Sequence, residues 1–543
     1  MTAPPPHPLT ATLPLTRLAL RQDRARLTVW ILGQSAFTAL ITAMSTAMPP
    51  HELLTETRFM ADNPGMRLTG LANGATAGAY TMVRGYLTLA VLTALLTILT
   101  VVRHTRRSED LGRHELLTSC PVGRHAPTAA ALLVALLADL ALTALTALAL
   151  TTAGLPAAPS LTAALALGAV GLAFAGVAAL TSQAAPTART ANALATAALA
   201  LAVLTCGIGN MAGQVTADGT HVDSAWPVWL SPLGWGQQMR PFDGERLAPL
   251  VLAAVFFLVC TGAAVLLATR RDLGRGLLPA RPGPARASRF LRGPTGLALR
   301  VHRGTILAWA VATTLFGLVL GAASEQVDDL TGSSREWYVR LGGTDDLHAA
   351  FQSSLVQMAG MLVAAHTVQI LLRLRGEEAA GHLENILTAA VSRARWAGGH
   401  LLVAALSATL QLSLFALALG TAEAGVRAVP PGNTLTLLGA CLTQLPSCLL
   451  LGAAVTALVA LRPRLAPTLS WALLSVFLLI GPLFGPDLAL PTLVQDLSPF
   501  AHLPRAPAEP FAPPALLGLL AASATLTALA LRALRRRDLI QAG

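Results

Sequence analysis

Lysine is absent from this chain, and charged side chains of either sign are scarce. All 38 basic residues are arginine, and charged residues make up 12% of the 543 positions. A standard Walker A motif, GxxxxGK[ST], requires a lysine that contacts the nucleotide phosphates. The chain therefore holds no such motif and cannot itself be a P-loop ATPase. It also lacks the H-E-x-x-H, nucleophile-elbow and Rossmann glycine patterns, so the sequence supports no catalytic constellation.

Cysteine is rare as well, with five residues in the whole chain. No C-x-x-C spacing occurs, and none of the five lies in a loop that we expect outside the cytoplasm. Neither a disulfide framework nor a metal site is therefore predicted. The five are Cys120, Cys206, Cys260, Cys441 and Cys448.

Apolar residues dominate what remains. Hydrophobic residues form 54% of the chain and the mean hydropathy is +0.61. Apolar runs of about 20 residues cross ~30 Å of hydrocarbon as helices, because lipid offers no partner to unpaired backbone groups. The sequence predicts an all-α polytopic membrane protein with about 12 transmembrane helices. They lie near 27–48, 80–103, 126–153, 159–184, 190–211, 247–269, 304–323, 351–372, 397–420, 434–461, 467–486 and 513–533.

Arginine is unevenly distributed between the two sets of loops. With a cytoplasmic N-terminus, the inner segments hold 29 arginines and the outer loops 9, whereas acidic residues number 9 inside and 17 outside. An excess of arginine in the inner loops is the positive-inside pattern, so we expect both termini in the cytoplasm. Because the arginines are scattered over seven short segments, they indicate the lipid bilayer as a partner and no nucleic acid.

The chain repeats itself at offsets of 266 to 279 residues. LALRQDRARLTVW at 18–30 aligns with LALRVHRGTILAW at 297–309, and further matches follow in the same order. Because six spans per half is an even number, the two repeats are parallel. We expect a first six-span half at 1–272, a cytoplasmic Arg/Pro/Gly-rich linker at 273–296 and a second six-span half at 297–543. The further matches include LLVALLA at 132–138 with LLVAALS at 401–407, LSP at 230–232 with 497–499, and RRD at 270–272 with 536–538.

Two charged segments interrupt this apolar chain after the second span of each half. They read RSEDLGRHELLTSC at 107–120 and RGEEAAGHLENILTAA at 375–390. An i, i+3, i+6 spacing places an acid, a glycine and an acid on one face of a helix. We expect a short amphipathic helix in each, with its glycine closely approached by another backbone. Such a helix is either a docking surface for another protein or an interfacial helix that rests on the bilayer. The aligned residues are Glu109, Gly112 and Glu115, and Glu378, Gly381 and Glu384; Glu109 can pair with Arg113, and Glu378 with His382.

The charged segments resemble the "EE-x-x-GR-x-E-LL" stretch of ABC exporter permeases of the type-2 class. The two-half layout, with WLSPLGWGQQMRPFDGER at 229–246, is similar to the actinobacterial permeases grouped with tetronasin resistance and polyketide-antibiotic export. The resemblance implies that the six aligned residues belong to coupling helices, which dock two copies of a soluble ABC ATPase subunit. It also implies location in a bacterial plasma membrane, with ATP and Mg bound by the partner chains and no cofactor in this one. The second copy departs from the pattern, with His382 in place of Arg113 and Asn385 in place of Leu116.

The remaining candidates lie in the outer loops and within the spans. Each Leu-Ser-Pro is a helix start, with serine as cap and proline in the first turn. It is either part of an outer gate, as in similar exporters, or an ordinary capped turn. Polar residues within spans are candidates for substrate binding or coupling, and the alternative is an internal hydrogen bond between helices. The residues are Ser231, Pro232, Ser498 and Pro499 for the gate, and Asp139 and His366 for the spans, with Gln411 and Gln444 as weaker candidates.

Two transport mechanisms fit these features. The first is the permease of an ATP-driven exporter of lipophilic or amphiphilic compounds such as antibiotics. The second is a proton- or sodium-coupled secondary transporter, which also often has six-plus-six repeats; Asp139 and His366 would then be its proton carriers. The duplicated acidic segments favour the first, because a secondary transporter gives them no role.

Overall fold

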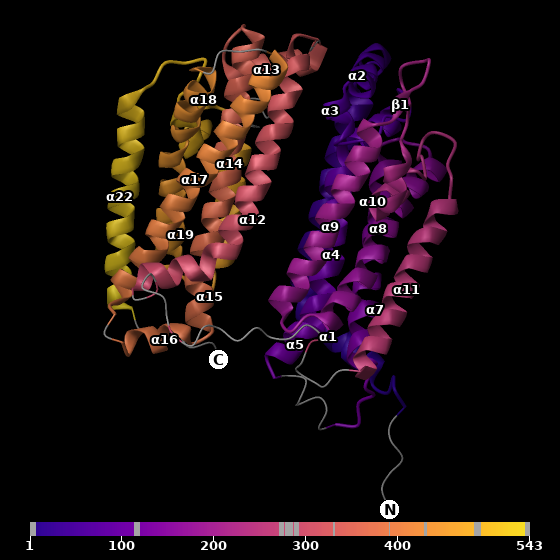
Figure 1. The fold of residues 1–543 in the computed structure, drawn as a ribbon, viewed down its shortest axis with the longest axis horizontal. Helices are drawn as coiled ribbons and strands as arrows, with labels where there is room; N and C mark the ends of the chain where they lie inside the picture. Colours follow the sequence, from indigo (N-terminus) through magenta and orange to yellow (C-terminus); the bar gives the residue numbers. More distant parts are fainter. Residues whose placement is uncertain are drawn as a thin grey trace, which may run out of the picture. The chain divides into compact units, whose positions relative to one another are not determined.

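A computed structural model describes residues 7–112, 120–270, 276, 286, 291, 293–329, 332–389, 391–427, 432–482 and 490–537. The chain divides into two compact units, Met1–Gly283 and Pro284–Gly543. This division falls inside the Arg/Pro/Gly-rich segment 273–296, the predicted linker. Each unit is a helical bundle, and the two are described separately (Figure 1).

Among the described residues of unit 1 (1–283) there are six long helices, with short elements at both ends of the bundle. In Figure 1, α2, α3 and β1 lie at one end of this unit and α5 at the other. The elements are α1 (Thr12–Ala47), α2 (Pro50–Asp62), α3 (Pro64–Arg67), α4 (Ala77–His104), α5 (Arg106–Asp110), α7 (Ala126–Thr152), α8 (Ala157–Ala184), α9 (Ala188–Met211), β1 (Gln214–Val215), β2 (Val222–Asp223), η1 (Trp226–Leu230), α10 (Pro232–Gln237) and α11 (Ala248–Arg270). Strands β1 and β2 form a small antiparallel hairpin.

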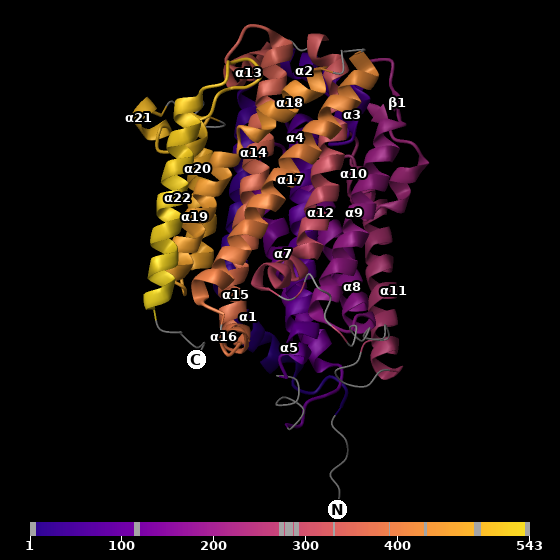
Figure 2. The same ribbon diagram turned by 60° about the vertical axis from the view of Figure 1, so that its left-hand side comes forward.

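Unit 2, residues 284–543, follows the same plan. In Figure 2, α13 and α21 lie at the end of this unit opposite α16, and α22 runs along one side. The elements are α12 (Pro294–Ala322), η3 (Ala323–Asp329), α13 (Gly332–Gly342), α14 (Leu347–Leu371), α15 (Arg373–Ala379), α16 (His382–Leu387), α17 (Arg393–Arg427), α18 (Gly432–Leu442), α19 (Leu445–Leu461), α20 (Ala466–Ile480), α21 (Thr492–Gln495), η4 (Pro499–His502) and α22 (Pro513–Arg536).

The prediction of an all-α polytopic membrane protein is confirmed. Within the described residues, 11 helices are long and apolar enough to cross a membrane. The span expected at 467–486 is α20, which has 15 residues and is about 22 Å long at ~1.5 Å per residue. The span expected at 434–461 is interrupted between α18 and α19, where Pro446 occupies the first turn of the new helix and has no N–H for a continuous ladder.

The two units pair their spans in the same way. In each, the first span packs against the third, the second against the third and fourth, and the fourth against the sixth. In unit 1 these are α1 with α7, α4 with α7 and α8, and α8 with α11. In unit 2 they are α12 with α17, α14 with α17 and α19, and α19 with α22. The sequence repeat therefore corresponds to a repeat of packing.

Small residues set the close approach of these helices. Gly317 and Gly321 lie one turn apart on α12, where a Cβ would be 2.6 Å from the carbonyl oxygen of Phe415 and 2.4 Å from that of Leu419 on α17. Such a small-xxx-small face lets two backbones pack directly, which is how helices associate where lipid provides no hydrophobic drive. The absence of a side chain at these two positions therefore lets α12 lie directly against the backbone of α17.

Candidate functional site

The first charged segment begins in α5, at the end of the second span. Arg106 is buried, and its Nη1 donates to Oε2 of Glu109 at 2.7 Å. Its Nη2 donates to the carbonyl oxygen of Pro186 at 2.5 Å, directly after α8. Oδ2 of Asp110 accepts from the backbone N–H of Ala188 at 2.7 Å, the first residue of α9. The segment is thus bound to the connection between the fourth and fifth spans. Glu115 and Arg113 lie outside the described residues.

The second charged segment comprises α15 and α16. The Glu378 side chain is 4% exposed and pairs with Arg537 and, at 3.9 Å, with Arg375. Arg537 follows α22, and its Nη1 donates to the carbonyl oxygen of Val459 at 2.6 Å, near the end of α19. Glu384 lies on the exposed side of α16. Of the acids aligned by sequence, the first is therefore buried and paired and the last faces outward.

Both glycines of these segments end a helix instead of lying within one. Gly112 has φ 67° and Gly381 has φ 72°, a left-handed conformation that glycine adopts without steric cost. A Cβ at either position would meet nothing within 4 Å. The expectation of a helical glycine approached by another backbone is therefore wrong. The expected Glu378–His382 pair is also wrong: the turn at Gly381 reorients His382, whose Nδ1 lies 3.0 Å from Oε2 of Glu377.

Asp139 lies in the middle of α7 with its carboxylate against α8. The residue is 6% exposed, and its Oδ1 has no hydrogen-bond partner among the described residues. A Cβ on Gly171 of α8 would be 2.1 Å from that oxygen. The missing side chain at Gly171 therefore makes the space that the carboxylate occupies. One turn further along α7, Thr143 meets Gly168 in the same manner.

His366 and Gln411 lie in the helix bundle of unit 2. The Nε2 of His366 on α14 is 3.0 Å from the hydroxyl of Ser407 on α17, and its ring lies beside that of Trp309 on α12, with centroids 5.3 Å apart. Gln411, one turn beyond Ser407, accepts from the hydroxyl of Thr313 at 2.9 Å and donates to the carbonyl of Ile306. Three spans thus meet in a line of polar contacts. Gln411 is satisfied by α12, as in an internal hydrogen bond between helices.

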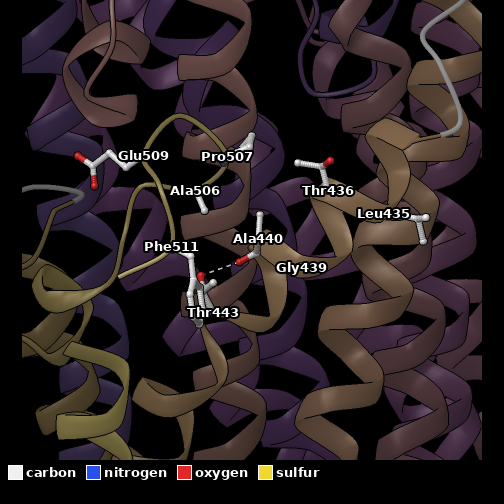
Figure 3. Close-up of a pocket in the computed structure, with 9 residues that line it drawn as sticks. All are labelled: Leu435, Thr436, Gly439, Ala440, Thr443, Ala506, Pro507, Glu509 and Phe511. Atoms are coloured by element: carbon white, nitrogen blue, oxygen red, sulfur yellow. Dashed lines mark hydrogen bonds between the residues drawn. The ribbon is translucent and has the colours of Figure 1, made fainter. Parts of the chain in front are cut away.

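Gln444 differs from Gln411 because both amide atoms of its buried side chain have no hydrogen-bond partner in the described part of the chain. It lies at the break between α18 and α19, against Gly360 of α14. A cavity of about 320 Å³ lies between α18 and the segment that precedes α22 (Figure 3), and Thr443, the residue before Gln444 in the sequence, is part of its lining. Its lining includes Thr436, Gly439, Thr443, Pro507, Glu509 and Phe511.

The serines of the two Leu-Ser-Pro motifs make the same contact in both units. Ser231 caps α10, where its hydroxyl accepts from the backbone N–H groups of Leu233 and Gly234. The same hydroxyl donates to the carbonyl of Ala202 in α9 at 2.6 Å. Ser498 precedes η4 and donates to the carbonyl of Phe477 in α20 at 2.9 Å, without a side-chain cap. Each motif is thereby bound to the fifth span of its own half.

Sequence reasoning missed two buried clusters at equivalent positions. Asp23 of α1 is buried and pairs with Arg103 at 2.9 Å and His104 at 2.9 Å on α4. Its repeat counterpart is His302 of α12, whose Nε2 is 2.9 Å from Nδ1 of His400 on α17. Both residues stand within the aligned stretches 18–30 and 297–309. The sequence signal for both clusters is an ionisable residue, Asp23 or His302, at the same position of two stretches that otherwise match.

Glu423 is a third buried group that the sequence did not single out. It lies near the end of α17, where its carboxylate meets His348 at 2.7 Å, Gln352 at 2.9 Å and Asn433 at 2.9 Å. The carboxylate therefore joins α14, α17 and the start of α18. The corresponding residue of the first half is Gly154, so the first half has no equivalent carboxylate at this position.

These features define the class of the protein: a multi-pass helical membrane protein of two repeated halves, an architecture found in transporters. Residues 291–535 match the family model described as "Multidrug efflux system permease Rv1217c, C-terminal domain". The chain is 36% identical over 539 residues to the multidrug efflux system permease protein Rv1217c of Mycobacterium tuberculosis, covering 97% of this chain and 95% of that relative. The chain belongs to this family of multidrug efflux system permeases. It is a multi-pass protein of the bacterial plasma membrane.

Proposed function

We propose that this permease is the membrane subunit of an ATP-driven ABC exporter, related to the type-2 class that includes the tetronasin-resistance permeases. The duplicated charged segment carries the proposal. Each half has an Arg-x-x-Glu-x-x-Gly stretch after its second span, and in the half where the following residues are described, the short helix α16 is largely exposed. A segment that occurs in both halves, is bound to the bundle before its glycine and is exposed in α16 is suited to bind the same partner once in each half.

The partners in this proposal are two copies of a soluble ABC ATPase, one for each half, and they bind ATP and Mg. The permease itself contributes no cofactor, in keeping with a sequence that has no lysine and no Walker A motif. The docking segments contain Glu109, Gly112 and Glu115 in the first half and Glu378, Gly381 and Glu384 in the second. The positive-inside distribution of arginine supports a cytoplasmic location for both segments.

The proposed substrates are lipophilic or amphiphilic compounds, antibiotics among them. The relative from M. tuberculosis is named for multidrug efflux, and apolar residues dominate every span. Within the spans, Asp139 carries a buried acceptor without a partner in the described residues, which suits a donor or a positive charge on an amphiphile. His366 with Ser407 forms a second polar point, in unit 2. Ser231, Pro232, Ser498 and Pro499 would anchor the outer gate to the fifth spans.

Transport by inverted membrane vesicles tests the source of energy. Vesicles containing the permease and its co-produced ATPase are expected to accumulate a fluorescent lipophilic dye when ATP is added. Uptake should stop with vanadate and continue with a protonophore. Vesicles whose ATPase lacks its Walker A lysine are the matched control. Uptake that needs a proton gradient and ignores vanadate would instead support a secondary transporter with Asp139 and His366 as proton carriers.

Subunit composition tests the proposed partners independently. Native mass spectrometry of the purified complex is expected to give one 56.1 kDa permease chain with two ATPase copies. A complex with one ATPase copy per permease chain contradicts the assignment of one docking segment to each half.

A further inference from the structure

The acid three residues before the glycine of each charged segment has a side chain that is largely covered and bound to arginine in both units. Glu109 and Glu378 occupy equivalent positions, and their side chains are 8% and 4% exposed. Each follows an arginine three residues earlier, Arg106 or Arg375. A buried carboxylate is costly unless it is paired and hydrogen-bonded. These two acids are therefore suited to hold the segment on the bundle, whereas in the second segment the exposed residues of α16 are suited to meet a partner.

In each unit one guanidinium joins this carboxylate to the end of the fourth span. In unit 1, Arg106 binds Glu109 and donates to the carbonyl of Pro186, two residues after α8. In unit 2, Arg537 binds Glu378 and donates to the carbonyl of Val459, in the last turn of α19. The last carbonyls of a helix have no partner within the helix, and a cation is favoured beside them.

The two units differ in where that arginine comes from. In unit 1 it belongs to the charged segment itself. In unit 2 the equivalent Arg375 is 3.9 Å from Glu378, beyond hydrogen-bond reach. Arg537, at the end of the sixth span, takes its place, and its own carbonyl accepts from Arg393 at the start of α17. Arg537 therefore joins the second segment to α19, and Arg537 is itself held by Arg393 of α17.

We propose that Arg537 is a positioning residue for the second ATPase-docking segment. It holds α15 against the end of α19, so that Gly381 turns the chain outward and α16 is presented in a fixed orientation. The first segment needs no such remote residue, because Arg106 is local. Docking at the second segment therefore depends on the position of α22, and docking at the first does not. This inference rests on the proposed function, which supplies the partner.

The test replaces Arg537 and follows both the segment and the partner. Arg537→Gln removes the charge, and Arg536→Gln is the matched control, because Arg536 is an exposed neighbour in the last turn of α22. Hydrogen exchange of residues 373–389, measured without any ATPase, reports how stably the segment is bound to the bundle. Native mass spectrometry and a titration with the ATPase report the number of copies bound and their affinities. A Glu378→Arg/Arg537→Glu double variant reverses the pair.

Arg537→Gln is expected to speed exchange in 373–389 and to weaken one of the two ATPase copies about tenfold or more, the scale of one lost charge-assisted hydrogen bond. The other copy and the control should be unchanged, the melting temperature should fall because Glu378 loses its paired charge, and the reversed pair should restore part of the affinity. If exchange and both affinities match the control, Arg537 does not position the segment. If the unaltered chain binds no ATPase at all, the proposed function fails first, and the two failures are thus distinguishable.

Discussion

The close contact between the carboxylate of Asp139 and Gly171 predicts that a larger residue at position 171 destabilises the protein. In Gly171→Ala, the new Cβ would be 2.1 Å from Oδ1 and 2.5 Å from Cγ of Asp139. Non-bonded heavy atoms need more than 3 Å, so the carboxylate must move by about 1 Å or more within a packed helix pair. Overpacking of this kind costs about 1–3 kcal/mol. An alanine in place of a helical glycine stabilises the helix by up to about 1 kcal/mol. Because the overpacking cost is larger, the net effect is a loss of stability.

A double-variant cycle separates this clash from any general effect on α8. Adding Asp139→Ala to Gly171→Ala removes the carboxylate, so the clash should disappear and the two changes should be non-additive by about 1–3 kcal/mol. Adding Asp139→Asn keeps the same shape without the charge, and should rescue little. Gly262→Ala on α11 is the control, because a Cβ there meets nothing within 4 Å.

Thermal unfolding in detergent, monitored by intrinsic fluorescence, gives the relative stabilities, and dye-stimulated ATP hydrolysis gives the effect on function. Gly171→Ala should melt at a lower temperature than Gly262→Ala, and only the double variant with Asp139→Ala should recover. Strictly additive effects, or equal rescue by Asp139→Asn and Asp139→Ala, would refute the contact. If Asp139 binds substrate, Asp139→Asn should also alter dye stimulation while the melting temperature stays the same.

Three further outcomes are expected. Gly381→Ala should cost about 1–2 kcal/mol of backbone strain, with Gly381→Asn milder, measured by hydrogen exchange of 373–389. Ser231→Ala loses a cap and a buried hydrogen bond and should destabilise by about 1–2 kcal/mol, seen in thermal unfolding. Hydrogen bonds from Thr216 and Thr220 lower the pKa of Asp218; its stabilisation of the β1–β2 hairpin is therefore present above pH ~4 and is lost as the pH falls further, measured by exchange at 214–223.

The spans were predictable because their signal is long and redundant. A run of 20 apolar residues tolerates several exceptions and still specifies a membrane helix. The charge distribution indicated a topology, and the sequence offsets indicated a repeat whose span pairs recur in both units. The beginnings of helices were less accurate: α1 begins at Thr12, well before the apolar run at 27, because its arginine-bearing first turns continue the helix outside the hydrophobic stretch.

The charged segments were located correctly but their local structure was not predicted. A glycine three residues after an acid fits both a continuous helix and one that ends, and the spacing alone does not separate them. The φ of 72° at Gly381 shows that the helix ends at this glycine. Likewise, Glu378 looked like a surface residue because its partner, Arg537, is 159 positions away. Only packing brings α15, α19 and the end of α22 together.

The polar residues within spans show the same limit. Asp139 was recognisable from composition, since an acid inside an apolar run is unusual. Its neighbour Gly171 was not, because a glycine in an alanine-rich helix has no distinguishing pattern. Gln411 looked equivalent to Gln444 in the sequence. The structure separates them, since Gln411 bonds to Thr313 and Ile306 while both amide atoms of Gln444 have no partner in the described residues.

Joining both halves in one chain changes what each half is free to become. A transporter assembled from two copies of one polypeptide must accept every substitution twice, at both symmetry-related places. In this chain each position of the two halves is encoded separately, so a substitution changes one half only. Asp23 bonds to Arg103 and His104 in one half, while its counterpart His302 meets His400 in the other. A single chain can therefore carry different residues at equivalent positions of its two halves, and an engineered permease built from two copies of either half would contain one of these two clusters twice and lose the other.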